Sequence, residues 1–169
     1  MEDFYLRKPN KNDEMEVMLY RKEFTEKNEY INGSSGLSKI NNYKVWLKKI
    51  SDENDINNNP IRSELLMIRQ SDNEIVGMIN IRHSLESGFE ISGGHIGYSI
   101  RPSERKKGYG NIILALALKY CKTLEIESVL VTCSKTNVAS KKVILNNGGI
   151  FESEIEENGK IIERYWIKN

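Results

Sequence analysis

The stretch that decides the fold is RPSERKKGYGNIILALALKYCKTL, from Arg101 to Leu124. It begins polar and basic, passes two glycines at Gly108 and Gly110, and becomes a run of helix formers. The first turn of a helix leaves backbone N–H groups unpaired, and the helix dipole is positive there. Glycine has no Cβ, so the chain turns tightly and a ligand can approach the backbone. The stretch therefore predicts an anion site at a helix start, and phosphate is the commonest occupant of such sites.

Two familiar phosphate motifs do not fit this stretch. A Walker A loop requires Gly-Lys-Ser or Gly-Lys-Thr, but Gly110 is followed by Asn111 and Ile112. A dinucleotide fingerprint requires a third glycine where Ile113 stands, and a hairpin precedes the strand. A plain glycine turn beside a solvated basic run is the alternative, because an isolated Gly-x-Gly is a weak motif.

The composition is that of an ordinary soluble globular protein. The 169 residues suit one domain, and we expect a single domain over residues 1–169. The net charge of +1 gives no support to binding of nucleic acid. The N-terminus lacks the layout of a signal peptide, and the longest apolar run, Ile112 to Leu118, is too short to span a bilayer. We therefore expect a cytoplasmic protein that does not bind membranes.

Neither cysteine predicts a chemical role. Cys121 and Cys133 lie in apolar segments, where the pKa of a thiol is raised and the group is inert. They suit a reducing compartment, and nothing favours a disulfide between them. Together with His83 and His95 they lack the close spacing of zinc ligands, so we expect no metal site.

Hydrophobic periodicity predicts the element order β-α-α-β-β-β-α-β-α-β-β. Strands are expected at Phe4–Arg7, Leu65–Ile68, Ile75–Ile81, His95–Ile100, Ser128–Cys133, Phe151–Glu157 and Lys160–Ile167. Helices are expected after Asp13, with an apolar stripe of Met15, Met18, Leu19 and Phe24, then over Tyr43–Ile50, Gly108–Leu124 and Asn137–Leu145. Hairpins occur together with strand–helix alternation. We therefore expect an α/β (α+β) fold with a mixed, mostly antiparallel sheet and helices on both faces.

In this context the opening stretch resembles the acetyl-CoA pyrophosphate loop of the GNAT acyltransferase superfamily. Arg-x-x-Gly-x-Gly, at Arg105 to Gly110, follows a strand and opens a long helix. Asn137 and Ser140, after the strand SVLVTC, look like that superfamily's Asn-x-x-Ser helix start. The element order and the closing hairpin ERYWI are also similar, and the clear motifs run from Gly94 to Trp166. The resemblance implies a GNAT-like fold and an acetyl-CoA-dependent N-acetyltransferase.

The same resemblance implies where acetyl-CoA binds as co-substrate. Backbone N–H groups of one loop would hold the pyrophosphate, and its residues are Arg105, Lys106, Lys107, Gly108, Tyr109, Gly110 and Asn111. The backbone of Ile100 would pair with the pantetheine arm, which Asn137 and Ser140 would flank from the other side. The implied acceptor is an amine of a small molecule or peptide, and the protein would be a monomer or a homodimer. A non-catalytic CoA-binding sensor or interaction module is the alternative.

The catalytic groups are indicated less directly. In many relatives a tyrosine seven residues after the Asn is the general acid, but Ile144 stands at that position here. Tyr98 and Tyr165 are then the candidate acids. His95 occupies a strand position where many relatives carry Glu, and it is the candidate base because histidine titrates near neutral pH. A structural, hydrogen-bonded role for His95 is the alternative.

The closing hairpin carries a row of carboxylates. A two-residue Asn158-Gly159 turn would place Glu154 directly opposite Glu163. Strand alternation would put on one face Glu152, Glu154, Glu156, Glu163 and Tyr165. The inward face would carry Phe151, Ile155, Ile162 and Trp166. Opposed carboxylates favour a nearby cation, either a lysine of the protein or the bound amine, and a solvated acidic edge is the alternative.

Overall fold

Two antiparallel sheets form the frame of the protein in the computed structural model, which describes residues 3–52, 62–85 and 91–169. The first sheet has the order β1-β2-β3-β4, with β1 at Phe4–Arg7, β2 at Arg62–Arg69, β3 at Ile75–Arg82 and β4 at Ile96–Ile100. The second sheet has the order β5-β7-β6, with β5 at Ser128–Ser134, β6 at Ile150–Glu157 and β7 at Lys160–Lys168. The main helices are α1 (Glu14–Thr25), α2 (Tyr43–Asp52), α3 (Tyr109–Thr123) and α4 (Val138–Asn146).

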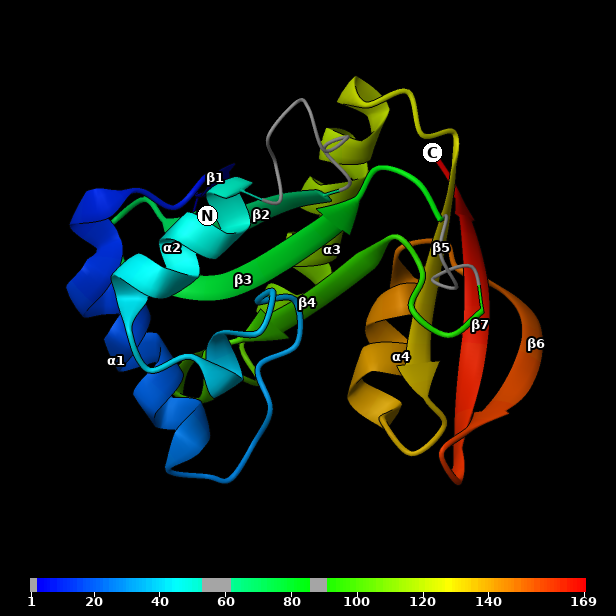
Figure 1. Ribbon diagram of the computed structural model, residues 1–169. Coiled ribbons are helices and arrows are strands. Elements are labelled where there is room, and N and C mark those ends of the chain that lie inside the picture. The colour runs from blue at the N-terminus through cyan, green and yellow to red at the C-terminus, as the bar shows by residue number, and fades with distance from the viewer. Residues whose placement is uncertain (1–2, 53–61, 86–90) are drawn as a thin grey trace.

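Helices α1 and α2 cover one face of the first sheet and α3 covers the other, while α4 lies against the second sheet, as Figure 1 shows. On the first sheet, Leu66 of β2 packs into the cluster with α1 and α2, whereas its neighbour Leu65 packs into the cluster with α3. This alternation buries both faces of β2. The predicted α/β fold with antiparallel strands and helices on both faces is confirmed. Among the described residues, no helix combines the length and the apolar character that crossing a membrane requires.

Helix α1 faces the core with a different stripe from the one predicted. The prediction named Met15, Met18, Leu19 and Phe24. The buried residues are Val17, Tyr20 and Phe24, while Met15 is 71% exposed. The prediction was right for Phe24 and wrong for Met15 and Leu19, which are exposed, and it left out Val17 and Tyr20. The Tyr20 hydroxyl donates to the carbonyl oxygen of Ser99 in β4 at 3.0 Å, so this tyrosine is buried with its polar atom satisfied.

The closing hairpin has the predicted register but the opposite inward face. Glu154 pairs with Glu163 across the turn, as expected. The buried residues of β7 are Glu163, Tyr165 and Ile167, which lie opposite the buried side of β5. Trp166, predicted to point inward, lies on the other face and is only half-buried. The prediction failed because a charged residue was assigned to solvent, whereas Glu163 is buried beside Lys141.

A bulge between Phe151 and Ser153 shifts the register of β6. Phe151 therefore lies opposite Tyr165, and the two rings pack edge to face with centroids 5.7 Å apart. Glu152 moves to the other face, where it accepts a hydrogen bond from the Trp166 indole at 2.7 Å. The predicted placement of Phe151 and Glu152 is thus reversed by one extra residue.

The two sheets meet just before β4. The backbone N–H of His95 donates to the carbonyl oxygen of Leu130 in β5 at 2.8 Å, and the N–H of Leu130 donates to Nδ1 of His95 at 2.9 Å. Gly94 makes this approach possible, because a Cβ there would lie 2.6 Å from the Leu130 oxygen. Beyond this joint β4 and β5 belong to different sheets. In the described part of the chain, the edge of β4 that faces β5 therefore has no strand partner.

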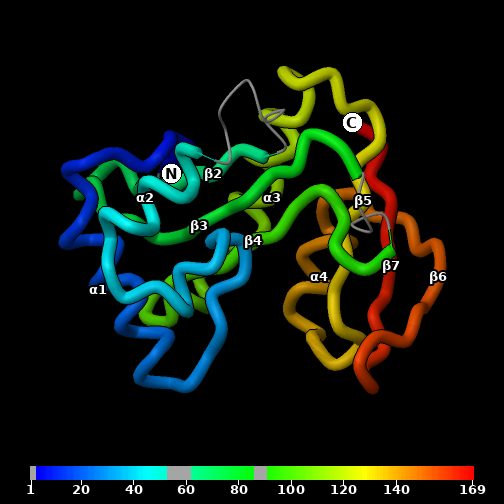
Figure 2. Tube along the Cα trace, in the orientation of Figure 1, coloured from blue at the N-terminus to red at the C-terminus, as the bar shows by residue number. Residues whose placement is uncertain are grey.

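The connection between α1 and α2 lies beside β4, as the views in Figures 1 and 2 show. Gly33 in this connection has a φ of +68°, and a Cβ there would approach the carbonyl oxygen of Gly97 to 2.2 Å. Only a glycine fits such an approach. The connection is thereby held against β4 one residue before Tyr98.

The contact between His95 and Leu130 predicts a measurable dependence of protein stability on pH. Burial, and to a smaller extent the charge of Arg82, lowers the pKa of His95 to about 4. The unfolded chain protonates this histidine near pH 6.5, so it binds more protons than the native state between pH 6.5 and 4. The stability from neutral His95 is complete above pH 6.5 and is lost as the pH falls toward 4. We expect the free energy of unfolding to fall by about 1.5 kcal/mol between pH 6.5 and 5 in urea titrations.

His95→Asn is the matched variant, because an amide oxygen can replace Nδ1 as the acceptor for Leu130 but does not titrate. We expect this variant to lose most of the slope between pH 6.5 and 5. An unchanged slope in His95→Asn would show that another group causes it.

Candidate active site

The loop before α3 is exposed and has an unusual backbone. It joins the short 3-10 helix at Pro102–Glu104 to α3, and its residues 105–108 are exposed. Lys106 and Gly108 are both left-handed, with φ of 65° and 86°. A Cβ on Gly108 would meet no atom within 4 Å, so the space in front of it is open. No side chain caps the first turn of α3. The N–H of Asn111 donates to the carbonyl oxygen of Gly108 at 3.0 Å, and the start of the helix presents its positive end to an anion from outside.

Three other residues of the predicted loop pack against the protein. Tyr109 is buried and contacts the ring of Phe4 at a centroid distance of 4.8 Å. A Cβ on Gly110 would lie 2.9 Å from Val143 of α4, so this glycine brings α3 and α4 together. The side-chain oxygen of Asn111 accepts a hydrogen bond from Asn146 at 3.2 Å. These positions shape the loop from behind.

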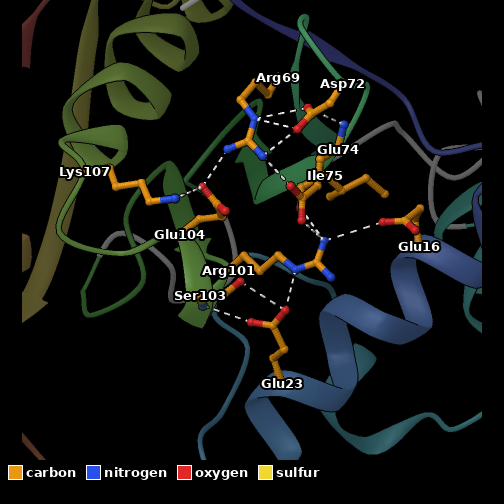
Figure 3. Close-up of polar contacts among 10 residues, drawn as sticks. All are labelled: Glu16, Glu23, Arg69, Asp72, Glu74, Ile75, Arg101, Ser103, Glu104 and Lys107. Atoms are coloured by element: carbon orange, nitrogen blue, oxygen red, sulfur yellow. Dashed lines mark hydrogen bonds and ion pairs between the residues drawn. The ribbon is translucent and has the colours of Figure 1, made fainter.

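The basic side chains of the loop are directed toward carboxylates. Arg105 donates to both oxygens of Glu29, at 3.0 and 2.5 Å. Lys107 donates to Glu104 at 2.9 Å, and Figure 3 shows it pointing at that carboxylate. Sequence analysis missed Glu104, for which the only signal was an acid placed directly before three bases. The backbone is thus a better candidate for anion binding than the Arg105 and Lys107 side chains.

Tyr98 of β4 and Ser140 of α4 bring their side chains together. Their side-chain oxygens lie 3.3 Å apart. Burial raises the pKa of Tyr98, and the Ser140 contact opposes part of that rise. The side chain of Asn137 accepts from the N–H of Ser140 at 3.1 Å, so it caps α4 as predicted. Ile100 ends β4, and its carbonyl oxygen accepts a bond from Arg105 at 3.3 Å.

The other two candidate catalytic residues are engaged elsewhere. The Tyr165 hydroxyl donates to Glu163 at 2.7 Å, and burial together with that carboxylate raises the tyrosine pKa. His95 uses Nδ1 to hold Leu130 in the joint between the sheets. The geometry therefore favours the structural alternative for His95. Ile144, at the position of the usual tyrosine, is fully buried in the core, so this position supplies no acid.

The opposed glutamates of the hairpin have lysine partners. Lys135 lies 2.7 Å from Glu154, and Lys141 lies 2.9 Å from Glu163. Hydrogen bonding from Lys141 outweighs burial and lowers the pKa of Glu163. Of the two kinds of cation considered from the sequence, a lysine of the protein lies beside each glutamate. These glutamates are therefore neutralised without a bound amine.

The cysteines and histidines form no metal site in the described ranges. Cys121 and Cys133 are both buried and free, and burial raises the pKa of each thiol to about 11. Within residues 3–52, 62–85 and 91–169, no group of three or more His, Cys, Asp or Glu side chains is arranged to hold a metal ion.

Comparison with known proteins identifies the family. Over residues 3–150 the sequence matches the model of the acetyltransferase (GNAT) domain. The chain belongs to this family. The GNAT chain is thus an acyltransferase of the acetyl-CoA-dependent type, as the sequence resemblance implied. No curated protein sequence matches it.

Solved structures share the fold at low sequence identity. Ribosomal-protein-S5-alanine acetyltransferase from Vibrio fischeri superposes with a TM-score of 0.77 at 13% identity, covering 100% of the GNAT chain and 94% of the other. RimJ from Mycobacterium smegmatis, solved with a CoA disulfide, gives 0.75 at 18% identity, covering 96% and 80%. Spermidine N-acetyltransferase from Vibrio cholerae, a dodecamer, gives 0.69 at 15% identity, covering 98% and 93%. These names describe the neighbours, and the likeness establishes the fold.

Proposed function

We propose that this GNAT chain transfers the acetyl group of acetyl-CoA directly to a primary amine of a small molecule or peptide. The observation that carries the proposal is the uncapped start of α3 behind Gly108, next to the unpartnered edge of β4. The first feature suits a pyrophosphate, because helix N–H groups and the dipole favour an anion. The second suits an extended chain with amide groups, because an edge strand offers unpaired N–H and C=O groups.

The residues at the edge of β4 and the start of α4 fit an acyl transfer without a covalent enzyme intermediate. The amine nitrogen attacks the thioester carbonyl carbon, a C–N bond forms, and the C–S bond breaks. The ammonium, with a pKa near 10.4, loses its proton to water before attack. Backbone N–H groups on the edge of β4 stabilise the charge that develops on the carbonyl oxygen. The Tyr98 hydroxyl donates its proton to the leaving thiolate, and the proton that the attacking nitrogen must still lose returns to the tyrosinate through water.

Tyr98 is the best-placed acid because it is half-buried, stays protonated at neutral pH, and contacts Ser140 at the start of α4. Its effect on rate is expected to be moderate, because a thiol has a pKa near 8.5 and its thiolate is a tolerable leaving group. The acceptor class is an amine, as for the neighbours whose names specify protein alanine or spermidine. The protein acts as a monomer or a homodimer in the cytoplasm.

The first test concerns the loop. Gly108→Val forces a β-branched residue into a left-handed conformation and projects its side chain into the open space before α3. We expect affinity for CoA, measured by calorimetry, to fall at least tenfold, about 1.4 kcal/mol. Gly159→Val is the control, because Gly159 is also left-handed with open space around it but lies in the β6–β7 turn. Equal affinity for CoA in the two variants would contradict the assignment of the pyrophosphate to this loop.

The second test concerns Tyr98. We expect Tyr98→Phe to lower kcat about 10- to 100-fold in a thiol-release assay with a panel of amines, a typical range for loss of a positioned acid. Affinity for CoA should stay within about twofold, because the hydroxyl acts on the leaving group. Tyr165→Phe is the control and should keep most of its kcat. An unchanged kcat in Tyr98→Phe would show that water, rather than Tyr98, protonates the leaving thiolate. If the wild-type protein binds CoA but acetylates no amine, the alternative of a CoA-binding sensor is favoured.

A further inference from the structure

A buried carboxylate lies directly under the loop that is proposed to bind pyrophosphate. Glu104 is 7% exposed and is the last residue before the exposed loop 105–108. Its carboxylate accepts from Arg69 at 2.6 Å and from Lys107 at 2.9 Å (Figure 3). Burial alone would raise the pKa of Glu104, but the bonds from Lys107 and Arg69 lower it. Glu104 is therefore charged at neutral pH.

Arg69 fixes this carboxylate from inside the protein. It ends β2, is 8% exposed, and also contacts Asp72 at 2.7 Å and Glu74. Glu74 contacts Arg101 at 2.8 Å, and Arg101 contacts Glu23 of α1 at 2.6 Å. Figure 3 shows these side chains as one continuous network between the β2–β3 turn, α1 and the loop. The loop is thus attached to two other elements through Glu104, the residue that precedes it.

The net charge of this network bears on how the loop could bind an anion. The network of Figure 3 contains three cations, Arg69, Arg101 and Lys107. It contains five carboxylates, Glu16, Glu23, Asp72, Glu74 and Glu104. Its net charge is negative, and Lys107 is directed into it. By Coulomb's law alone, such a cluster opposes the binding of an anion in front of the loop.

The backbone explains why a carboxylate is placed there. Lys106 and Gly108 on either side of Lys107 are both left-handed, and a non-glycine residue in that region needs its surroundings to hold it. The ion pair from Glu104 to Lys107 lies between these two positions and fixes the loop in this conformation. Held in this way, the loop keeps Gly108 in the left-handed conformation from which α3 begins.

We propose that Glu104 is a positioning residue for CoA binding, acting through Lys107 on one side and Arg69 on the other. This inference rests on the proposed function, because it assumes that CoA binds at this loop. In this role the negatively charged Glu104 favours the binding of an anion, although its own charge repels that anion. Removing the charge should therefore weaken binding of CoA.

The experiment compares two glutamates that each hold a cation of the same loop. Glu104→Gln removes one negative charge beneath the loop and releases Lys107. Glu29→Gln removes one negative charge beside the loop and releases Arg105, whose ion pair is more exposed. We expect calorimetry to show CoA binding at least fivefold weaker in Glu104→Gln, and unchanged or up to about twofold tighter in Glu29→Gln. Tighter or equal binding in Glu104→Gln would overturn the proposal, because simple electrostatics gives that result.

Three further readouts separate positioning from charge and from misfolding. The loss in Glu104→Gln should persist at 0.5 M salt, where interactions between exposed charges are largely screened. The KM for acetyl-CoA should rise while kcat and the KM for the amine stay near wild type. Lys107→Met, a substitution at an exposed side chain, should also weaken binding, and the double variant should be no worse than either single variant. Additive losses in the double variant would show that the two residues act separately, against the proposal.

The two levels of the interpretation fail in different ways. If the wild-type protein does not bind CoA, the proposed function fails. If the wild-type protein binds CoA and Glu104→Gln binds it as tightly, only the positioning role fails.

Discussion

The hydrogen bonds between His95 and Leu130 are the interaction on which the rest of the structure depends. They join the residue before β4 to β5, after which the two strands enter separate sheets. A longer ladder between β4 and β5 would pair the edge of β4 that this arrangement leaves exposed. Because Nδ1 must accept a bond from Leu130, the imidazole has to remain neutral at that nitrogen. The fold therefore uses this histidine as a joint, which conflicts with its use as a base.

Buried charge is the second recurring constraint. Glu163 and Glu104 are each almost fully buried, and each is held by a lysine and at least one further hydrogen-bond donor. Removing one partner of such a pair is costly because it leaves a desolvated charge. The two acids have different surroundings. Glu163 packs between β7 and α4, whereas Glu104 adjoins the exposed loop and can influence what that loop binds.

Much of the fold and part of the site could be predicted from the sequence. Strand and helix periodicity, the turn at Asn158-Gly159 and the loop from Arg105 to Gly110 predicted the element order, the hairpin register and the helix start that the structure contains. Local pattern specified these features. The inward face of β7 could not be predicted in the same way, since it depends on Lys141 reaching Glu163 from α4. The role of His95 depends on contact with Leu130, 35 residues away in the sequence.

The most direct measurement of the central claim is amide hydrogen exchange with and without saturating CoA. If the edge of β4 and the start of α3 form the CoA site, exchange should slow in residues 97–100 and 106–111. The β6–β7 turn and the shallow groove of Lys11, Tyr43 and Lys48 should not change. Protection confined to that groove, or absent from β4 while CoA is bound, would contradict the assignment.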